Sequence, residues 1–118
     1  MRNYLMAALG AAVLLAAPVA DASAGDGLNR WVRINNVSGF RTVVTLYAVP
    51  SHYQASRISG RDWIPHVTIR PGQSYAVNFD DGRATCHYDL RATSETSGRD
   101  WIVRNFNVCA RTSLNLGV

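Results

Sequence analysis

Cys86 and Cys109 are the two cysteines of this 118-residue chain, and a thiol is the most reactive side chain that it carries. Redox couples tend to be spaced Cys-x-x-Cys, whereas these two residues lie far apart in the sequence. In an oxidising compartment, two cysteines usually pair. The sequence therefore predicts a structural disulfide between Cys86 and Cys109 rather than a thiol catalyst.

The three histidines, His52, His66 and His87, are the side chains best suited to bind zinc or copper. No two of them have helical or hairpin spacing, so a metal site would need the fold to bring all three together. Asp80 and Asp81 precede a glycine, as in a tight turn, rather than following the regular spacing of a calcium loop. We predict no metal and no cofactor. A small metal-handling protein that uses the three histidines is the alternative.

Catalytic signatures are missing from the sequence. It contains no nucleophile elbow, no glycine-rich phosphate loop and no metalloprotease helix. The carboxylates are scattered over turns, so they do not support a glycosidase pair. We predict no catalytic residue. A hydrolase or enzyme inhibitor without a recognisable signature is a second alternative.

One hexapeptide, Ser-Gly-Arg-Asp-Trp-Ile, occurs twice, at 59–64 and 97–102. The favoured interpretation is structural, because tryptophan is buried on average. Ser-Gly would form a bend, after which the tryptophan and isoleucine enter the core. The functional interpretation is a pair of surfaces that stack on a sugar or peptide. The candidate ligand contacts are then Arg61, Trp63, Arg99 and Trp101.

All twelve basic residues are arginine, and the net charge is +4. The arginines are scattered from Arg30 to Arg111. Nucleic-acid binding usually requires a basic patch with neighbouring aromatic residues. The sequence shows no such patch, and we predict no nucleic-acid partner.

The elements that must position these residues are short strands separated by turn signals. The pattern predicts an all-β domain, a small antiparallel β-sandwich of about seven strands, with a small barrel as the alternative. Pro71-Gly72 predicts a type II turn, and Asp81-Gly82 a hairpin turn. The segment 51–60 is polar and predicts a long loop. The expected strands are 30–36, 41–49, 63–69 (the weakest, because it contains Pro65), 75–79, 86–92, 102–109 and 112–116.

The predicted disulfide leaves the register of the last hairpin open. If Cys86 lies directly opposite Cys109, the hairpin is centred between Ser97 and Gly98, at a good turn dipeptide. This register places the apolar residues of the two strands on different faces. Either a β-bulge between residues 102 and 109 reconciles the faces, or the disulfide joins strands that are not hairpin partners.

The N-terminus predicts export. Arg2 precedes an apolar run from 4 to 17, Pro18 breaks the run, and Ala22-Ser23-Ala24 forms a small-x-small cleavage site. Residues 1–24 therefore read as a signal peptide, because the apolar run is shorter than the ~20 residues of a spanning helix. The segment 25–118 is one domain by length, with no membrane span, and is periplasmic or secreted.

Four motifs in the segment 69–109 are specific in combination. They are a Pro-Gly-x-Ser turn at 71–74, Asn-Phe-Asp-Asp-Gly at 78–82, Cys-x-Tyr-Asp-x-Arg at 86–91 and a terminal Asn-Val-Cys at 107–109. Together they resemble a group of small exported bacterial proteins. The resemblance implies export, one disulfide and no assigned activity, and it transfers no catalytic residue. The chain departs from the pattern between Thr93 and Arg99, where an Asp-Gly turn is expected.

These observations favour a non-enzymatic periplasmic or secreted interaction module. A β-sandwich presents loops at both ends, and binding residues are concentrated in loops. The sequence does not identify the partner, for which an envelope protein or a glycan is the expected class.

We predict that the mature protein begins at Gly25, because the cleavage site ends at Ala24. N-terminal sequencing of protein exported by a bacterial host measures this directly. A mature chain that retains Met1 would contradict both the cleavage and the compartment.

Overall fold

The computed structural model describes residues 24–96 and 98–117. The expected signal peptide, residues 1–24, lies outside the described residues except for Ala24. In the described segments, no helix has the length and apolar character needed to cross a membrane.

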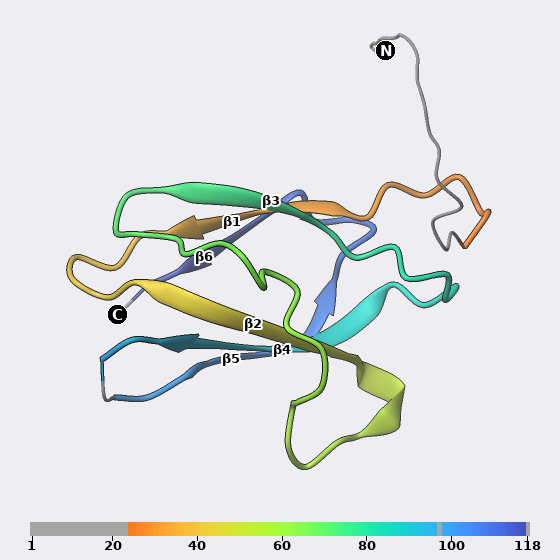
Figure 1. Ribbon diagram of the computed structural model, residues 1–118. Helices are drawn as coiled ribbons and strands as arrows, with labels where there is room; N and C mark the ends of the chain where they lie inside the picture. Colours follow the sequence, from red (N-terminus) through yellow and green to blue (C-terminus); the bar gives the residue numbers. More distant parts are fainter. Residues whose placement is uncertain (1–23, 97, 118) are drawn as a thin grey trace, which may run out of the picture.

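Two three-stranded sheets face each other and form a small sandwich (Figure 1). The first sheet has the order β3-β1-β6, with β1 at Trp31–Asn36, β3 at Ser74–Asn78 and β6 at Ser113–Leu116. The second has the order β2-β4-β5, with β2 at Val43–Pro50, β4 at His87–Ser94 and β5 at Trp101–Asn107. A 3-10 turn, η1, spans Ser51–Tyr53. The predicted all-β sandwich is confirmed.

The core lies between the sheets, and the alternation of inward and outward residues is clearest in β1 and β4. In β1, Val32 and Ile34 are fully buried, whereas Trp31 and Arg33 point outward. In β4, Tyr88, Leu90 and Ala92 face the core, so alternation turns Asp89 and Arg91 to the outer face. The two faces of β4 therefore contact different parts of the protein.

The predicted strand at 63–69 and the predicted hairpin turn at Asp81-Gly82 both differ from expectation. The segment 63–69 is not a strand, because Pro65 has no N–H to donate and the Val67 amide donates to the Ile64 carbonyl at 3.2 Å in a turn. Isolated bridges join β2 to this part of the chain, from Val43 to Ile69 at the end of the segment and from Tyr47 to Asp62 just before it.

The Asp81-Gly82 turn does not close a hairpin. It connects β3 to β4, which belong to different sheets. The last strand, β6, is also unusual, since it pairs with β1 in parallel whereas the other strand pairs are antiparallel.

The structure contains the predicted disulfide between Cys86 and Cys109, with a Cα–Cα distance of 5.3 Å. The register with the two cysteines directly opposite is wrong by one residue: His87 pairs with Asn107, and the Val108 amide donates to the Cys86 carbonyl at 2.8 Å. Cys109 lies in the turn that follows β5.

A β-bulge resolves the conflict between the two faces, as one of the alternatives anticipated. Tyr88 pairs with Phe106, but Leu90 pairs with Val103, so β5 contains one extra residue. Asn105 has φ = 57°, a left-handed conformation that asparagine tolerates better than most residues. Phe106 and Val103 thereby both point to the core side.

We expect the double variant Cys86→Ala/Cys109→Ala to lose about 3 kcal/mol of unfolding free energy, because the disulfide closes a loop with a sequence separation of 23. Urea denaturation of the oxidised protein and of the variant measures the difference. Equal unfolding free energies would show that the disulfide does not stabilise this fold.

Candidate ligand-binding pocket

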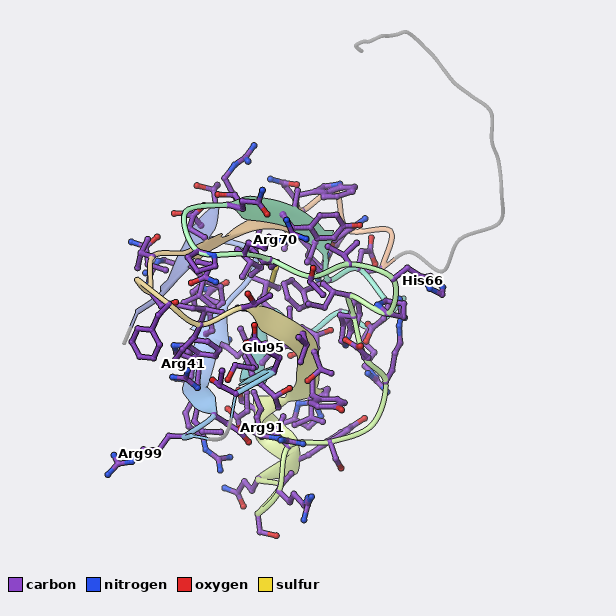
Figure 2. The ribbon with its side chains drawn as sticks, turned by 60° about the vertical axis from the view of Figure 1, so that its left-hand side comes forward. Arg41, His66, Arg70, Arg91, Glu95 and Arg99 are labelled. Atoms are coloured by element: carbon purple, nitrogen blue, oxygen red, sulfur yellow. A yellow bond between two sulfur atoms is a disulfide. The ribbon has the colours of Figure 1, made fainter. Side chains whose placement is uncertain are left out.

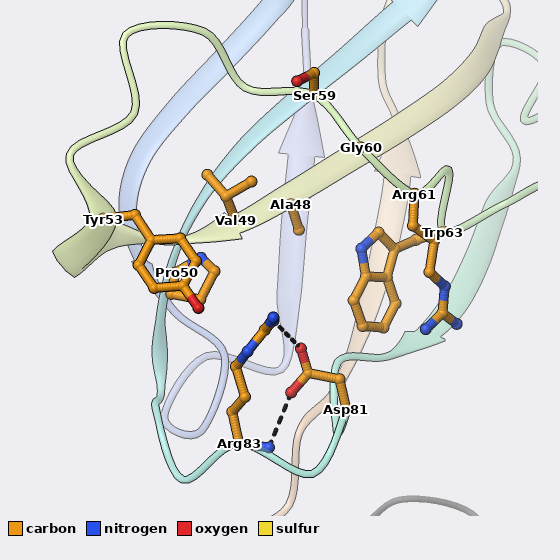
Figure 3. Close-up of a pocket in the computed structure, with 10 residues that line it drawn as sticks. All are labelled: Ala48, Val49, Pro50, Tyr53, Ser59, Gly60, Arg61, Trp63, Asp81 and Arg83. Carbon is orange, nitrogen blue, oxygen red and sulfur yellow. Dashed lines mark hydrogen bonds and ion pairs between the residues drawn. The ribbon is translucent and has the colours of Figure 1, made fainter.

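A pocket with a volume of about 360 Å³ opens beside the end of β2 (Figure 3). Segments distant in the sequence meet here: β2 and η1, the first copy of the hexapeptide, and the crossing between the two sheets. The lining residues are Ala48, Val49, Pro50, Tyr53, Ser59, Gly60, Arg61, Trp63, Asp81 and Arg83.

Two aromatic rings form opposite walls of the pocket. In Figure 3, Trp63 lies on one side and Tyr53 on the other, with Ala48 and Val49 of β2 behind them. Trp63 is held by the core, where its ring packs against Phe79 at a centroid distance of 5.2 Å. The guanidinium of Arg61 lies 4.1 Å from the Trp63 ring centroid. Tyr53 is 53% exposed.

The backbone around Asp62 fixes the position of Trp63. The Asp62 carboxylate accepts hydrogen bonds from the amides of Leu46 and Ile64, both at 3.0 Å. The Trp63 amide donates to the Leu46 carbonyl at 2.8 Å. Asp62 and Trp63 are thus both attached to Leu46, in the middle of β2.

Asp81 and Arg83 form the floor of the pocket. Arg83 Nη1 contacts Asp81 Oδ2 at 2.7 Å, and the backbone amide of Arg83 donates to Asp81 Oδ1 at 3.1 Å. The buried Tyr88 hydroxyl donates to the same oxygen at 3.2 Å. Burial, together with the negative charge of Asp81, raises the pKa of Tyr88 to about 12. Tyr88 therefore stays protonated and orients Asp81 from inside the core.

The wall that carries Tyr53 is held by Asp89, on the outer face of β4. Asp89 is buried, and its carboxylate accepts from Ser51 Oγ at 2.8 Å, the Asn105 amide at 2.8 Å and Arg104 Nη1 at 3.0 Å. Ser51 begins η1, and Tyr53 ends it. Asp89 therefore fixes the turn that positions Tyr53.

The rest of the loop is attached to the same face of the sheet. Arg104 also donates to the Ala55 carbonyl at 3.0 Å, and Arg91 Nε donates to the Ile58 carbonyl at 2.7 Å. The Ile58 side chain is buried outside the main core. These contacts determine where Ser59, Gly60 and Arg61 enter the pocket.

The second hexapeptide lies away from the pocket. Trp101 is covered by the guanidinium of Arg41, 3.9 Å from its ring centroid, and its Nε1 donates to the Gly117 carbonyl. Arg99 is exposed, and its side chain points away from the domain in Figure 2. Ile102 is 50% exposed, so the expectation that it enters the core is wrong, because alternation along β5 turns it outward. Of the four candidate contacts, Arg61 and Trp63 line the pocket, whereas Arg99 and Trp101 do not.

The histidines lie on three separate segments, and all are exposed. His52 belongs to η1, His66 projects from the 63–69 segment (Figure 2), and His87 begins β4. Across residues 24–96 and 98–117, no three His, Cys, Asp or Glu side chains lie where they could hold one metal ion. The metal-handling alternative therefore finds no site in this part of the chain.

Sequence reasoning missed Tyr53, Asp81 and Arg83. Tyr53 lies in the predicted polar loop, where an aromatic residue among polar neighbours is the one available signal. Asp81 and Arg83 were hidden by the hairpin interpretation of their turn. No protein-family model, curated protein or solved structure matches the chain.

We expect Asp89→Asn to lower the unfolding free energy at pH 7 by about 1–3 kcal/mol, since three donors address the ionised carboxylate. Burial opposes ionisation of Asp89, but the hydrogen bonds from Asn105, Ser51 and Arg104 outweigh it and lower its pKa below the ordinary value of an aspartate. The stabilisation is complete above the pKa of the unfolded chain, near 4, and is lost as pH falls through the lower pKa of the folded state.

The measurement is urea denaturation of both proteins between pH 7 and pH 2. The difference in unfolding free energy should shrink across the acid range. A constant difference over all pH values would show that the charge of Asp89 is not responsible.

Proposed function

We propose that this chain is an exported, non-enzymatic binding module, periplasmic or secreted, whose pocket binds a sugar ring of a glycan. The observation that carries the proposal is the pair of aromatic walls, Trp63 and Tyr53, placed across one small pocket above a charged floor. Export is supported by the disulfide, the N-terminal sequence pattern and the resemblance to small exported bacterial proteins.

A sugar ring matches the pocket in shape and chemistry. Its C–H face packs on the electron-rich face of an indole or phenol ring, and its hydroxyls hydrogen-bond to charged side chains such as Arg83 and Asp81. The volume of about 360 Å³ lies near the lower end of the usual range for small-ligand sites, about 300–1,000 Å³. One or two rings of a chain would enter, with the remainder outside.

An extended peptide fits this pocket less well. Peptides of that kind bind by adding a strand to a free sheet edge. The edge of β2 is already occupied, because Asp62 and Ile69 bridge to it and the Trp63 amide donates to Leu46. Pro50, at the end of β2 in the pocket, has no N–H to offer.

The pocket chemistry also favours binding over hydrolysis. Its lining contains one carboxylate, Asp81, which already accepts three hydrogen bonds. Glycoside hydrolysis usually uses two carboxyl groups about 5–9.5 Å apart. None of the three histidines is a lining residue.

The repeated hexapeptide provides a matched test. We expect Trp63→Ala to weaken the binding of a glycan trimer about tenfold, because an aromatic contact contributes about 1 kcal/mol in addition to the buried area. Trp101→Ala, in the same local sequence, should change affinity less than about twofold, since Trp101 does not line the pocket. Titration calorimetry with trimers of galacturonate, mannuronate and glucose measures both variants.

Tyr53→Ala is the second variant, because an exposed ring can be removed with little effect on folding. It should also weaken binding, with an unchanged melting temperature. Equal effects of Trp63→Ala and Trp101→Ala would remove the pocket from the proposal. Failure of every trimer to bind the unaltered protein would defeat the glycan function.

A further inference from the structure

We infer that the sugar bound in this pocket is acidic, a uronate, and that Arg83 binds its carboxylate. The inference rests on the proposed function and specifies its ligand. It follows from the unequal exposure of the two charged residues on the floor, from the number of hydrogen bonds that each already makes, and from the charge of the lining.

Asp81 is directed inward and Arg83 outward. The Asp81 side chain is 11% exposed, whereas that of Arg83 is 50% exposed. In Figure 3, the Arg83 guanidinium lies beside the Asp81 carboxylate, on the Tyr53 side of the floor. Of the two charged groups, the guanidinium is the more accessible to a ligand between Trp63 and Tyr53.

Arg83 retains most of its hydrogen-bonding capacity. A guanidinium has five N–H donors, and within the described residues Arg83 uses its Nη1 on Asp81. Its Cζ lies 5.7 Å from the Tyr53 ring centroid, a contact that occupies no donor. The planar fork matches a carboxylate in a bidentate geometry, which a hydroxyl cannot reproduce.

Asp81 orients Arg83 at two points, through Nη1 and through the backbone amide. Because the Tyr88 hydroxyl also fixes Asp81, the fork is held before the ligand arrives. Such preorganisation lowers the entropic cost of binding. Asp81 is in this view a positioning residue, and Arg83 is the ligand contact.

The charge of the lining favours an anion. Arg61 and Arg83 are two cations against one carboxylate, and the whole chain carries +4. Arg61 lies over Trp63, so its charge is close to any ring that stacks on that indole. The carboxylate of a uronate projects from the rim of its ring, which allows the face to pack on Trp63 while the rim reaches Arg83.

The test compares each acidic sugar with its own methyl ester, which keeps the ring and removes the charge. Trimers of galacturonate and of mannuronate, each as free acid and as methyl ester, are titrated into the mature protein. We expect at least one free acid to bind about tenfold tighter than its ester, the size of a charge-assisted hydrogen bond. Raising the salt concentration from about 20 to 300 mM should lower the affinity for the free acid and leave the affinity for the ester unchanged.

Arg83→Gln should weaken binding of the free acid about tenfold more than binding of the ester and so abolish the preference for the acid. Arg83→Lys should retain part of the preference. The matched control is Arg99→Gln, which removes an exposed arginine outside the pocket and should leave the preference unchanged. Melting temperatures verify that each variant is folded.

The outcomes separate the two proposals. Trp63-dependent binding of acid and ester with equal affinity would overturn the inference and leave the glycan function intact. A preference for the acid that survives Arg83→Gln would overturn the assignment of Arg83. Binding of neither form, nor of the glucose trimer, would defeat the proposed function together with the inference. Binding of trialanine that depends on Trp63, without binding of any sugar, would show that the pocket binds peptides and would overturn both proposals.

Discussion

The geometry of this domain depends on the three hydrogen bonds that the buried carboxylate of Asp89 accepts. The loss of hydration of a buried ionised group must be compensated by hydrogen-bond donors. Asp89 has one donor from η1, the Ser51 hydroxyl, and two from β5, the Arg104 guanidinium and the Asn105 amide. The Asn105 amide can reach it because the bulge turns that residue out of the β4 ladder. The same bulge returns Phe106 to the core. One charge thus connects the register of the last hairpin to the loop that carries Tyr53.

The two hexapeptides show how far identical sequence can diverge in role. Asp62 accepts hydrogen bonds from the backbone amides of Leu46 and Ile64, whereas Asp100 pairs with Arg91 at 2.9 Å. Trp63 lines the pocket, whereas Trp101 packs against Arg41 and the C-terminal segment and lies outside the pocket. Local sequence determines the bend and the ring, and the neighbouring segments determine whether that ring is available to a ligand.

The sequence was sufficient to predict the strands whose apolar alternation is strong, as in β1 and β4, and the disulfide. It was insufficient where long-range contacts decide. A turn such as Asp81-Gly82 has the same local chemistry whether it closes a hairpin or crosses between sheets. The scattered arginines also concealed Arg30, a fully buried residue that pairs with Asp26 through two hydrogen bonds and donates to the Ala84 and Thr85 carbonyls. The local patterns also could not show that Tyr53 and Arg83 meet Arg61 and Trp63 at one pocket, because these residues come from segments that only the fold brings together.

The strand motif Cys-x-Tyr-Asp-x-Arg, at 86–91, has a physical explanation in this chain. Cys86 fixes the start of β4 through the disulfide, and the next residues alternate between the two faces of the sheet. Tyr88 points inward and orients Asp81, and hence Arg83, whereas Asp89 points outward and fixes the turn that carries Tyr53. Arg91, again on the outer face, holds the Ile58 carbonyl where the chain returns toward the pocket. One strand therefore positions both sides of the pocket, the floor through the core and the wall through the outer face. A change in its register would separate the Arg83 fork from the aromatic walls even if every residue of the pocket were kept.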